Sequence, residues 1–215
     1  MKSILLIGLG RFGRHAAMKL QALHHEVLAI DKNEQRVHDA LPFVTNAQIG
    51  DSTNEALIES LGVRNFDLCI VASGDDFQSS LETTALLKEH GASLVLSRAT
   101  REVHAKFLLR NGADEIVYPE KQMAEWAAVR YSSSHIFDYV ELTPEYAIYE
   151  TAVPASWIGK TVVNLAVRQK YRINILAIQH SGILEPLPGP AHCFQKGETI
   201  FILGRNHDVE KFLRG

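Results

Sequence analysis

SILLIGLGRFG, residues 3–13, places an apolar run of strand length directly before the glycine pattern Gly-x-Gly-x-x-Gly. An amphipathic segment with helical spacing follows at once, and a second short apolar run over residues 27–30 ends in Asp31. Strand, glycine turn, helix, strand and acidic residue, in this order, form the fingerprint of a dinucleotide-binding βαβ unit. We therefore expect the chain to open with such a unit.

Each glycine of this pattern has its own physical role. Gly8 permits the tight turn off the strand, Gly10 lets the backbone approach a phosphate, and Gly13 lets the helix pack closely on the sheet. The unpaired N–H groups and the positive dipole at the helix start would then hold the anion. Asp31 follows Gly8 at close to the roughly 20-residue spacing at which a carboxylate reaches the ribose hydroxyls.

Arg11 lies inside the glycine turn. A fixed guanidinium there would compensate the charge of a di- or triphosphate through paired hydrogen bonds. The helix dipole mildly disfavours a cation at a helix start when no anion is present. The position therefore favours a phosphate-binding role over that of an ordinary surface arginine.

The bulk composition describes an ordinary globular protein of 215 residues, with 46% hydrophobic and 22% charged residues. Its net charge of −3, without a basic run, argues against a nucleic-acid partner. Neither an apolar stretch of membrane-spanning length nor a secretory signal pattern is found, so a cytoplasmic location is expected. Cys69 is expected to be a small buried apolar residue, and Cys193 offers it no obvious disulfide partner.

Apolar runs of strand length alternate with helical segments over residues 1–120. This alternation predicts an α/β fold with a doubly wound, Rossmann-like parallel sheet. Residues 121–137 are expected to form an amphipathic crossover helix and linker, which the serines at 132–134 would end. Residues 138–215 change in character and predict a second, smaller α+β domain. In it we expect a helix over residues 159–170 and a stiff loop formed by Pro186, Pro188 and Pro190.

Polar residues follow the carboxyl ends of the expected strands, the edge where such sheets bind ligands. Asp51, Asp75 and Asp76 would either face the ligand or cap the helices that follow them. Arg98 would either balance phosphate charge or pair with a nearby carboxylate. The nucleotide-binding residues predicted at this edge are Gly8, Gly10, Arg11, Phe12, Gly13, Asp31, Lys32, Asp51, Ser73, Gly74 and Arg98.

The sequence lacks the arrangements that usually carry catalysis. There is no evident Ser-His-Asp set, no cysteine nucleophile with a base, no Walker lysine motif and no HExxH among the ten histidines. A nucleotide pocket without catalytic partners suggests a sensor and not an enzyme. The alternative is an NAD-dependent oxidoreductase, for which Asp31 suits NAD better than NADP because a carboxylate repels a 2′-phosphate.

Several stretches resemble the RCK domains, also called KTN or TrkA-N domains, that regulate potassium uptake systems. They are residues 8–13, 25–31, 50–53, 61–67, 112–114 and 119–121. The tail resembles the TrkA-C domain of the same family. The matching positions are residues 158–161, Leu165, Arg168, residues 170–171, residues 175–178, Pro188, Pro190, residues 197–198 and Gly204. One copy of each domain is similar to the KtrA type of subunit, and the resemblance covers nearly the whole chain.

The resemblance implies an octameric cytoplasmic ring, built from dimers, that sits at the inner face of the membrane. There it would gate a potassium-translocating subunit of the KtrB or TrkH kind. It implies ATP and ADP as competing ligands, with NAD(H) bound in some relatives. By the same resemblance, Glu120 would help bind a magnesium or calcium ion, although a carboxylate is also favoured there simply by the helix dipole. The tail would bind cyclic di-AMP at a second ligand site near Arg168, Ile175 and Pro188.

Overall fold

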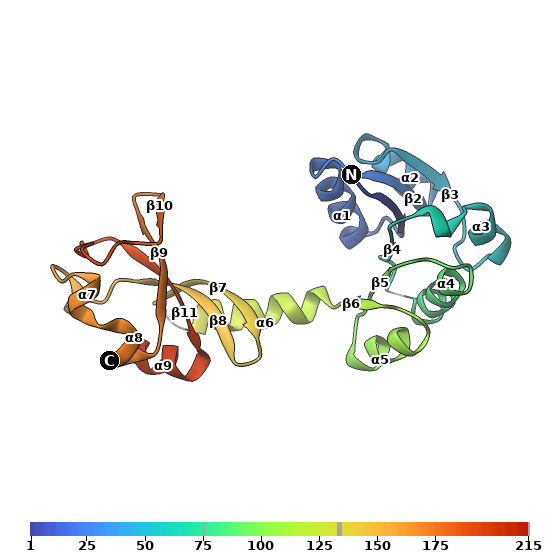
Figure 1. Ribbon diagram of the computed structural model, residues 1–215. Coiled ribbons are helices and arrows are strands. Elements are labelled where there is room, and N and C mark those ends of the chain that lie inside the picture. The colour runs from blue at the N-terminus through green and yellow to red at the C-terminus, as the bar shows by residue number, and fades with distance from the viewer. Residues whose placement is uncertain (75, 133–134, 215) are drawn as a thin grey trace. The chain divides into compact units, whose positions relative to one another are not determined.

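The βαβ unit expected at the amino terminus is present in the computed structural model of the chain (Figure 1). It consists of β1 (Ser3–Ile7), α1 (Arg11–Ala22) and β2 (Glu26–Asp31), with β1 and β2 paired in parallel. Ile4, Leu5, Leu6 and Ile7 are all buried. A strand buried on both of its faces is typical of the centre of a parallel sheet, which is where β1 lies.

The structure describes residues 1–74, 76–132 and 135–214. The chain divides into two compact units, Met1–Gln122 and Met123–Gly215. Within the described part of the first unit, parallel strands form a six-stranded sheet in the order β3-β2-β1-β4-β5-β6. The remaining elements of this unit are α2 (Glu34–Ala40), β3 (Asn46–Ile49), α3 (Glu55–Ser60), β4 (Leu68–Val71), α4 (Phe77–Glu89), β5 (Val95–Arg98), α5 (Glu102–Arg110) and β6 (Glu115–Val117).

Helices cover both faces of this sheet, as the doubly wound prediction requires. On one face, Ala17 of α1 and Val37 of α2 pack against Ile4 and Leu6 of β1. On the other face, α3 and α4 pack against the alternate residues of the same strand. Side chains of a strand alternate between its two faces, so β1 contributes to both cores.

Three helices of this unit begin at a residue whose side chain caps them. Asn33 accepts a hydrogen bond from the Arg36 N–H and Asn54 from the Ala56 N–H. Asp76 accepts from the Ser79 N–H. Such caps satisfy backbone donors that the first helical turn leaves unpaired. Asn33 and Asn54 therefore cap α2 and α3, and Asp76 takes the capping alternative for α4.

The second unit is built on an antiparallel sheet, confirming the change of character expected after the Rossmann-like part. Its strand order is β10-β9-β11-β8-β7. The strands are β7 (Ile136–Thr143), β8 (Tyr146–Ala152), β9 (Asn174–His180), β10 (Ile183–Pro186) and β11 (Thr199–Arg205). The helices are α7 (Val162–Leu165), α8 (Val167–Tyr171) and α9 (Asn206–Arg214).

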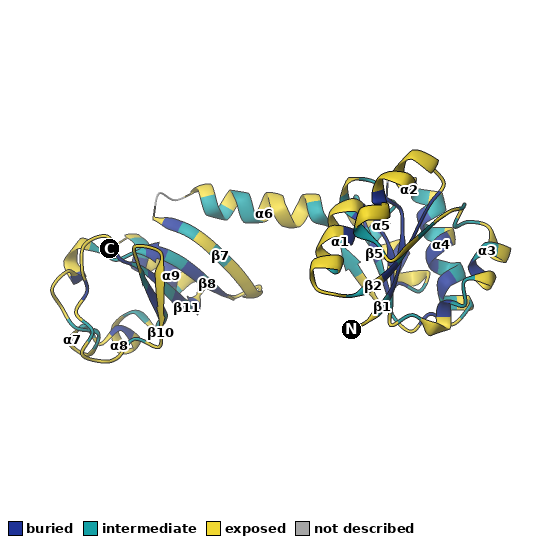
Figure 2. Cartoon of the chain, turned by 90° about the horizontal axis from the view of Figure 1, so that it is seen from above, coloured by how far each residue is buried: buried dark blue, intermediate teal, exposed yellow. Residues whose placement is uncertain are grey.

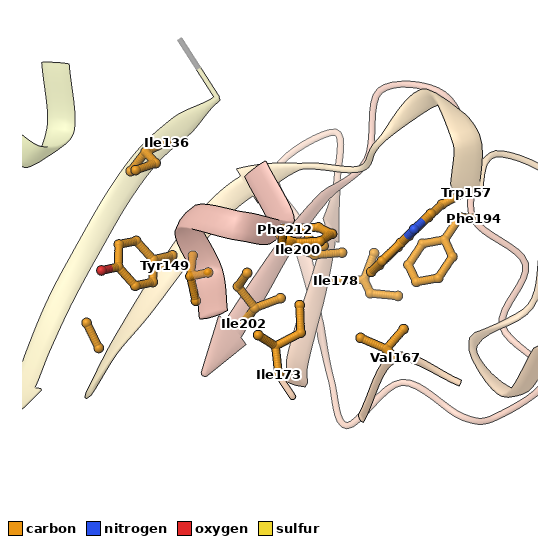
Figure 3. Packing of buried hydrophobic residues seen from close by; sticks show 12 residues of the cluster. Ile136, Tyr149, Trp157, Val167, Ile173, Ile178, Phe194, Ile200, Ile202 and Phe212 are labelled. Atoms are coloured by element: carbon orange, nitrogen blue, oxygen red, sulfur yellow. The ribbon is translucent and has the colours of Figure 1, made fainter. Parts of the chain in front are cut away.

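The core of this second unit gathers around Trp157, which is 2% exposed (Figure 3). The rings of Phe194, Phe212 and Tyr171 lie 5.4, 5.1 and 5.8 Å from the Trp157 ring, centre to centre. Aliphatic residues from β9 and β11, including Ile178 and Ile200, complete the cluster. Each unit thus has a hydrophobic core of its own.

Helix α6 (Pro119–Ser132) crosses the boundary between the two units. Its last described residue, Ser132, is the first of the serines expected to end the helix, and β7 begins at Ile136. None of its residues is buried, and Figure 2 shows it in the colours of exposed and intermediate residues. The expected break at residues 133–134 lies outside the described residues. The separate segment 121–137 therefore stays a prediction.

Two expectations for the second unit were wrong in detail. The helix expected over residues 159–170 is divided into α7 and α8, because Ala166 adopts a left-handed conformation with φ of 46°. Part of the expected proline loop is strand β10, which ends at Pro186 and pairs only with β9. A proline is tolerated there because an edge strand leaves one side of its backbone unpaired. In the described part of the chain, no helix is both long and apolar enough to cross a lipid bilayer.

Candidate functional site

A cavity of about 580 Å³ opens at the carboxyl edge of the parallel sheet. The strand order reverses between β1 and β4, and the turns that leave these two strands both line the cavity. Open α/β sheets bind their ligands in the crevice at such a reversal. The lining residues are Ile7, Gly8, Gly10, Arg11, Phe12, His15, Ile30, Asp31, Lys32, Arg36, Gly50, Asp51, Ser52, Ala72, Ser73, Gly74, Asp76, Ser79, Arg98, Pro119 and Glu120.

The three glycines of the first turn have the geometry that their predicted roles need. Gly8 has φ of +95°, and a Cβ there would lie 2.8 Å from the Ser73 nitrogen. A Cβ on Gly13 would lie 1.9 Å from the Gly8 carbonyl oxygen, so α1 is pressed against the turn. A Cβ on Gly10 would have no atom within 4 Å. Gly10 therefore borders open space where an incoming group can reach the backbone.

The start of α1 faces this opening without a side-chain cap. Gly10 is the N-cap residue, and it has no side chain to accept the first N–H groups of the helix. The Arg14 N–H is the first that bonds to the Gly10 carbonyl, so the N–H groups before it have no helical acceptor. Helix starts of this kind bind phosphate through those N–H groups and the helix dipole. The turn thus fits the phosphate part of a nucleotide.

Asp31 is buried and holds the turn in place. Its Oδ2 accepts a hydrogen bond from the Leu9 N–H at 2.7 Å, and its Oδ1 accepts from the Asn33 N–H at 2.8 Å. Arg36 Nη1 lies 3.7 Å from the same Oδ2. Each carboxylate oxygen can accept more than one hydrogen bond, so a ribose hydroxyl can still be bound. Asp31 therefore joins the glycine turn to the start of α2, a positioning role that the sequence did not reveal.

Asp51 and Asp76 lie on the cavity wall, and each accepts hydrogen bonds from a residue that closely follows it; Asp76 caps α4, whereas the cap of α3 is Asn54 and not Asp51. Asp51 Oδ1 accepts from the Thr53 N–H and hydroxyl, and these bonds, followed by the charge of Lys32, lower the pKa of the Asp51 carboxyl. Bonds from the Ser79 hydroxyl and N–H, again with a smaller effect of Lys32, lower the pKa of Asp76. Both carboxylates stay charged at neutral pH and border the cavity beside Lys32. The remaining residue of this group, Asp75, lies outside the described residues.

A cluster of charged residues forms another part of the wall. Arg98 Nη2 donates to Glu120 Oε1 at 2.6 Å, and this bond is the largest cause that lowers the pKa of the Glu120 carboxyl. The charge of Arg11 lowers it further. The alternative of an ion pair for Arg98 is therefore realised. Because Arg98 also lines the cavity, its guanidinium can still contact a phosphate.

Glu120 is the residue expected to help bind a divalent cation. Among the described residues, no group of three or more histidine, cysteine, aspartate or glutamate side chains is placed to hold a metal ion. A lone carboxylate supplies two oxygens at most, whereas magnesium and calcium take six or more ligands. Such a cation would therefore need phosphate oxygens and water to complete its shell.

Ser73 and Gly74 lie where the sequence predicted, in the turn after β4. A Cβ on Gly74 would lie 3.3 Å from the Arg98 carbonyl oxygen, so this turn approaches the end of β5 closely. Other lining residues were not predicted from the sequence. His15 is one helical turn after Arg11, a spacing that could have revealed it. No comparable signal marks Ser52, Ser79 or Arg36, which reach the cavity through tertiary packing.

The three residues of the expected second ligand site lie on different segments of the second unit. Arg168 is exposed on α8, Ile175 is half-buried on β9, and Pro188 is half-buried in the segment after β10. Ile175 packs against the core around Trp157. The second site therefore stays a prediction.

The chain matches the family of TrkA-N domains over residues 4–119 and that of TrkA-C domains over residues 147–214. It is 37% identical to the Ktr system potassium uptake protein A of Bacillus subtilis (strain 168), over 98% of this chain and 95% of that protein. It is 36% identical to the Ktr system potassium uptake protein C of the same organism, over 98% and 96%. Both relatives are named for potassium uptake.

The solved structure described as the GsuK channel bound to NAD has the same fold. Its TM-score with this chain is 0.71 at 16% identity, over 100% of this chain and 39% of that one. The structure described as the GsuK RCK domain gives a TM-score of 0.70 at 16% identity, over 99% and 47%. The chain thus spans less than half the length of these solved structures, and the likeness concerns the fold.

Proposed function

This chain belongs to the family of proteins built from TrkA-N and TrkA-C domains, and from that membership we propose that it is a regulatory subunit of a membrane potassium transporter. In this proposal it binds an adenosine nucleotide as a signal and does not convert it. ATP and ADP compete for the cavity, and NAD(H) is the alternative ligand. The chain acts as a ring of dimers, an octamer, at the cytoplasmic face of the membrane.

The observation that carries this proposal is the open space beside the Gly10 backbone. There an uncapped helix start, a residue without a side chain and a cavity of nucleotide size meet at the reversal of the sheet. Arg11, Lys32, Arg36 and Arg98 add positive charge to the same wall. Such an arrangement suits a compound that carries a ribose at one end and several phosphates at the other.

A nucleotide can act as a signal only if ATP and ADP contact the protein differently. We expect Arg11 to make that difference, because its guanidinium would bind the terminal phosphate of ATP, which ADP lacks. A magnesium or calcium ion beside Glu120 would be held by phosphate oxygens and water together with that carboxylate. Helix α6, whose first turn contains Glu120, would transmit the conformational change to the second unit. There cyclic di-AMP would bind as a second ligand.

The decisive experiment measures binding of ATP, ADP and NADH to the purified chain by calorimetry, with the mass of the particle determined in each state. We expect the chain to bind both ATP and ADP, and we expect the mass of the particle to differ between the two bound states. Arg11→Ala should lower the preference for ATP over ADP by about tenfold, as expected for a lost charge-assisted hydrogen bond. Equal preferences in the variant and the wild type would reject this role of Arg11.

Arg14→Ala is the matched control for this variant. Arg14 lies on the same helix and has its guanidinium over the Phe43 ring, 5.7 Å from its centre, and it does not line the cavity. It should keep the wild-type preference. Turnover of NADH with a carbonyl substrate would instead favour the oxidoreductase alternative.

A further inference from the structure

The short ion pair between Arg98 and Glu120 lies within the wall of the cavity proposed for the nucleotide. Arg98 is the last residue of β5, and Glu120 lies in the first turn of α6. The Arg98 side chain is 12% exposed, whereas that of Glu120 is 57% exposed. The buried partner is thus the cation, and the accessible partner is the anion.

A guanidinium that has lost most of its contact with water needs an anion to offset the desolvation. Glu120 supplies that anion, and the Arg11 charge also acts on its carboxylate. Two arginines that line the cavity, Arg98 and Arg11, therefore act electrostatically on the Glu120 carboxylate. A terminal phosphate carries more charge than a carboxylate and can accept from the same guanidinium through two oxygens.

We propose that the Glu120 carboxylate competes with the terminal phosphate of the nucleotide for the Arg98 guanidinium. Without a nucleotide, its carboxylate neutralises Arg98. When a nucleotide binds, the phosphate takes over the Arg98 contact, and Glu120 is released from the pair. This inference rests on the proposed function, because it assigns the phosphate end of the same cavity.

The exchange has a consequence for the role of divalent cations. A phosphate beside an unpaired Glu120 carboxylate is repelled, since both groups are negative. A cation between them replaces this repulsion with attraction. Glu120 should therefore weaken nucleotide binding when no divalent cation is present and cease to do so when one is supplied.

The chain provides a matched comparison for this pair. Lys121 is the next residue of α6, and its Nζ lies 2.5 Å from Oε1 of Glu102 in α5. The Glu102 side chain is 64% exposed. This second pair also joins the first turn of α6 to a neighbouring element, but neither residue lines the cavity. Glu102→Gln therefore removes the same charge and a similar contact without touching the proposed subsite.

The test is the affinity for ATP in the presence of EDTA, measured by calorimetry for the wild type, Glu120→Gln and Glu102→Gln. Because Glu120 is more than half exposed, its electrostatic effect is screened, and we expect Glu120→Gln to bind ATP about two- to fivefold more tightly. The gain should shrink in high salt. It should also disappear when magnesium is added. Glu102→Gln should bind as the wild type does.

A double variant separates exchange at Arg98 from a general charge effect. In the Arg98→Ala background, Glu120→Gln should give a smaller gain, because the contact for which the carboxylate competes is gone and only its repulsion of the phosphate remains. The same gain in both backgrounds would overturn the exchange, and so would wild-type or weaker ATP affinity of Glu120→Gln in EDTA. Failure of Arg98→Ala to fold, judged by thermal melting, leaves the single-variant comparison decisive. A wild type that binds no ATP would instead overturn the proposed function.

Discussion

Gly10 and Gly13 stand three residues apart in one motif, yet a methyl group added to each would meet different surroundings. At Gly13 the new Cβ would lie 1.9 Å from the Gly8 carbonyl oxygen, far inside contact distance. At Gly10 it would meet nothing within 4 Å, and the φ of −65° there suits any residue. Packing therefore requires glycine at position 13, whereas at position 10 packing does not, and we propose that the approach of a ligand does.

Alanine at each of these positions should separate stability from binding. Gly13→Ala should lower the free energy of unfolding by about 1–3 kcal/mol or more, because α1 must move away from the turn. Gly10→Ala should leave this free energy within about 0.5 kcal/mol of the wild type and weaken ATP binding, because the methyl group occupies the approach to the helix start. Urea unfolding and calorimetry check the two effects. Wild-type ATP affinity in Gly10→Ala would contradict this assignment.

The positive φ of Gly8 and the close approach of Gly13 to the Gly8 carbonyl could be predicted from sequence because they depend on the backbone of one local turn. The bond between Arg98 and Glu120 could not, since it depends on the end of β5 lying beside the start of α6. The same limit applies to Asp31. Its place at the end of β2 marked it as a candidate ligand for ribose, but its bond to the Leu9 N–H appears only when β1 and β2 are paired.

Helices α4 and α5 are joined by a histidine that the sequence analysis did not single out. His104 of α5 is fully buried, and its Nε2 lies 2.6 Å from the Ser80 hydroxyl of α4. The Phe77 ring packs 4.9 Å from the imidazole. Burial, followed by the positive charges of Arg101 and Arg98, lowers the pKa of His104 below 6.5. The imidazole is therefore neutral in the folded protein.

This lowered pKa predicts how stability depends on pH. In the unfolded chain His104 takes up its proton near pH 6.5, while the folded protein takes it up only at lower pH. The contribution of His104 is complete above pH 6.5 and falls as the pH drops below that value. Urea unfolding at pH 7.5, 6.5 and 5.5 should show the decline. His104→Gln should be less stable at pH 7.5 and show a shallower decline, whereas exposed His38→Gln should keep the wild-type slope. An unchanged slope in His104→Gln would refute the assignment.

At the scale of elements, the parallel strands were predictable because continuous apolar runs between helices have few alternatives. The second unit was less predictable. The break between α7 and α8 depends on a left-handed Ala166, a conformation that no alanine signals in sequence. Strand β10 is short and ends in proline, so its pattern could not be told from a loop until its pairing with β9 was known.

At the scale of the whole molecule, the hydrophobic cores of the two units share no described residue. The cores of the first unit lie on the two faces of the parallel sheet, and the core of the second lies around Trp157. The candidate cavity is lined only by residues of Met1–Gln122. The change in sequence character after the serines at 132–134 predicted a second domain, whereas the way in which one unit affects the other has no local signature in the sequence.

Damage to one core should therefore remain local. Trp157→Ala removes a large ring that is 2% exposed and should destabilise the second unit by about 3–5 kcal/mol. Amide hydrogen exchange should then accelerate in β9 and β11 and stay slow in β1 and β4, since separate cooperative units open independently. Trp126→Ala is the matched control: this tryptophan of α6 is only half-buried and bonds to Asp138 at 2.9 Å, so a smaller loss is expected. Equal acceleration of exchange in β1 and β9 of Trp157→Ala would mean that the two units unfold as one cooperative unit.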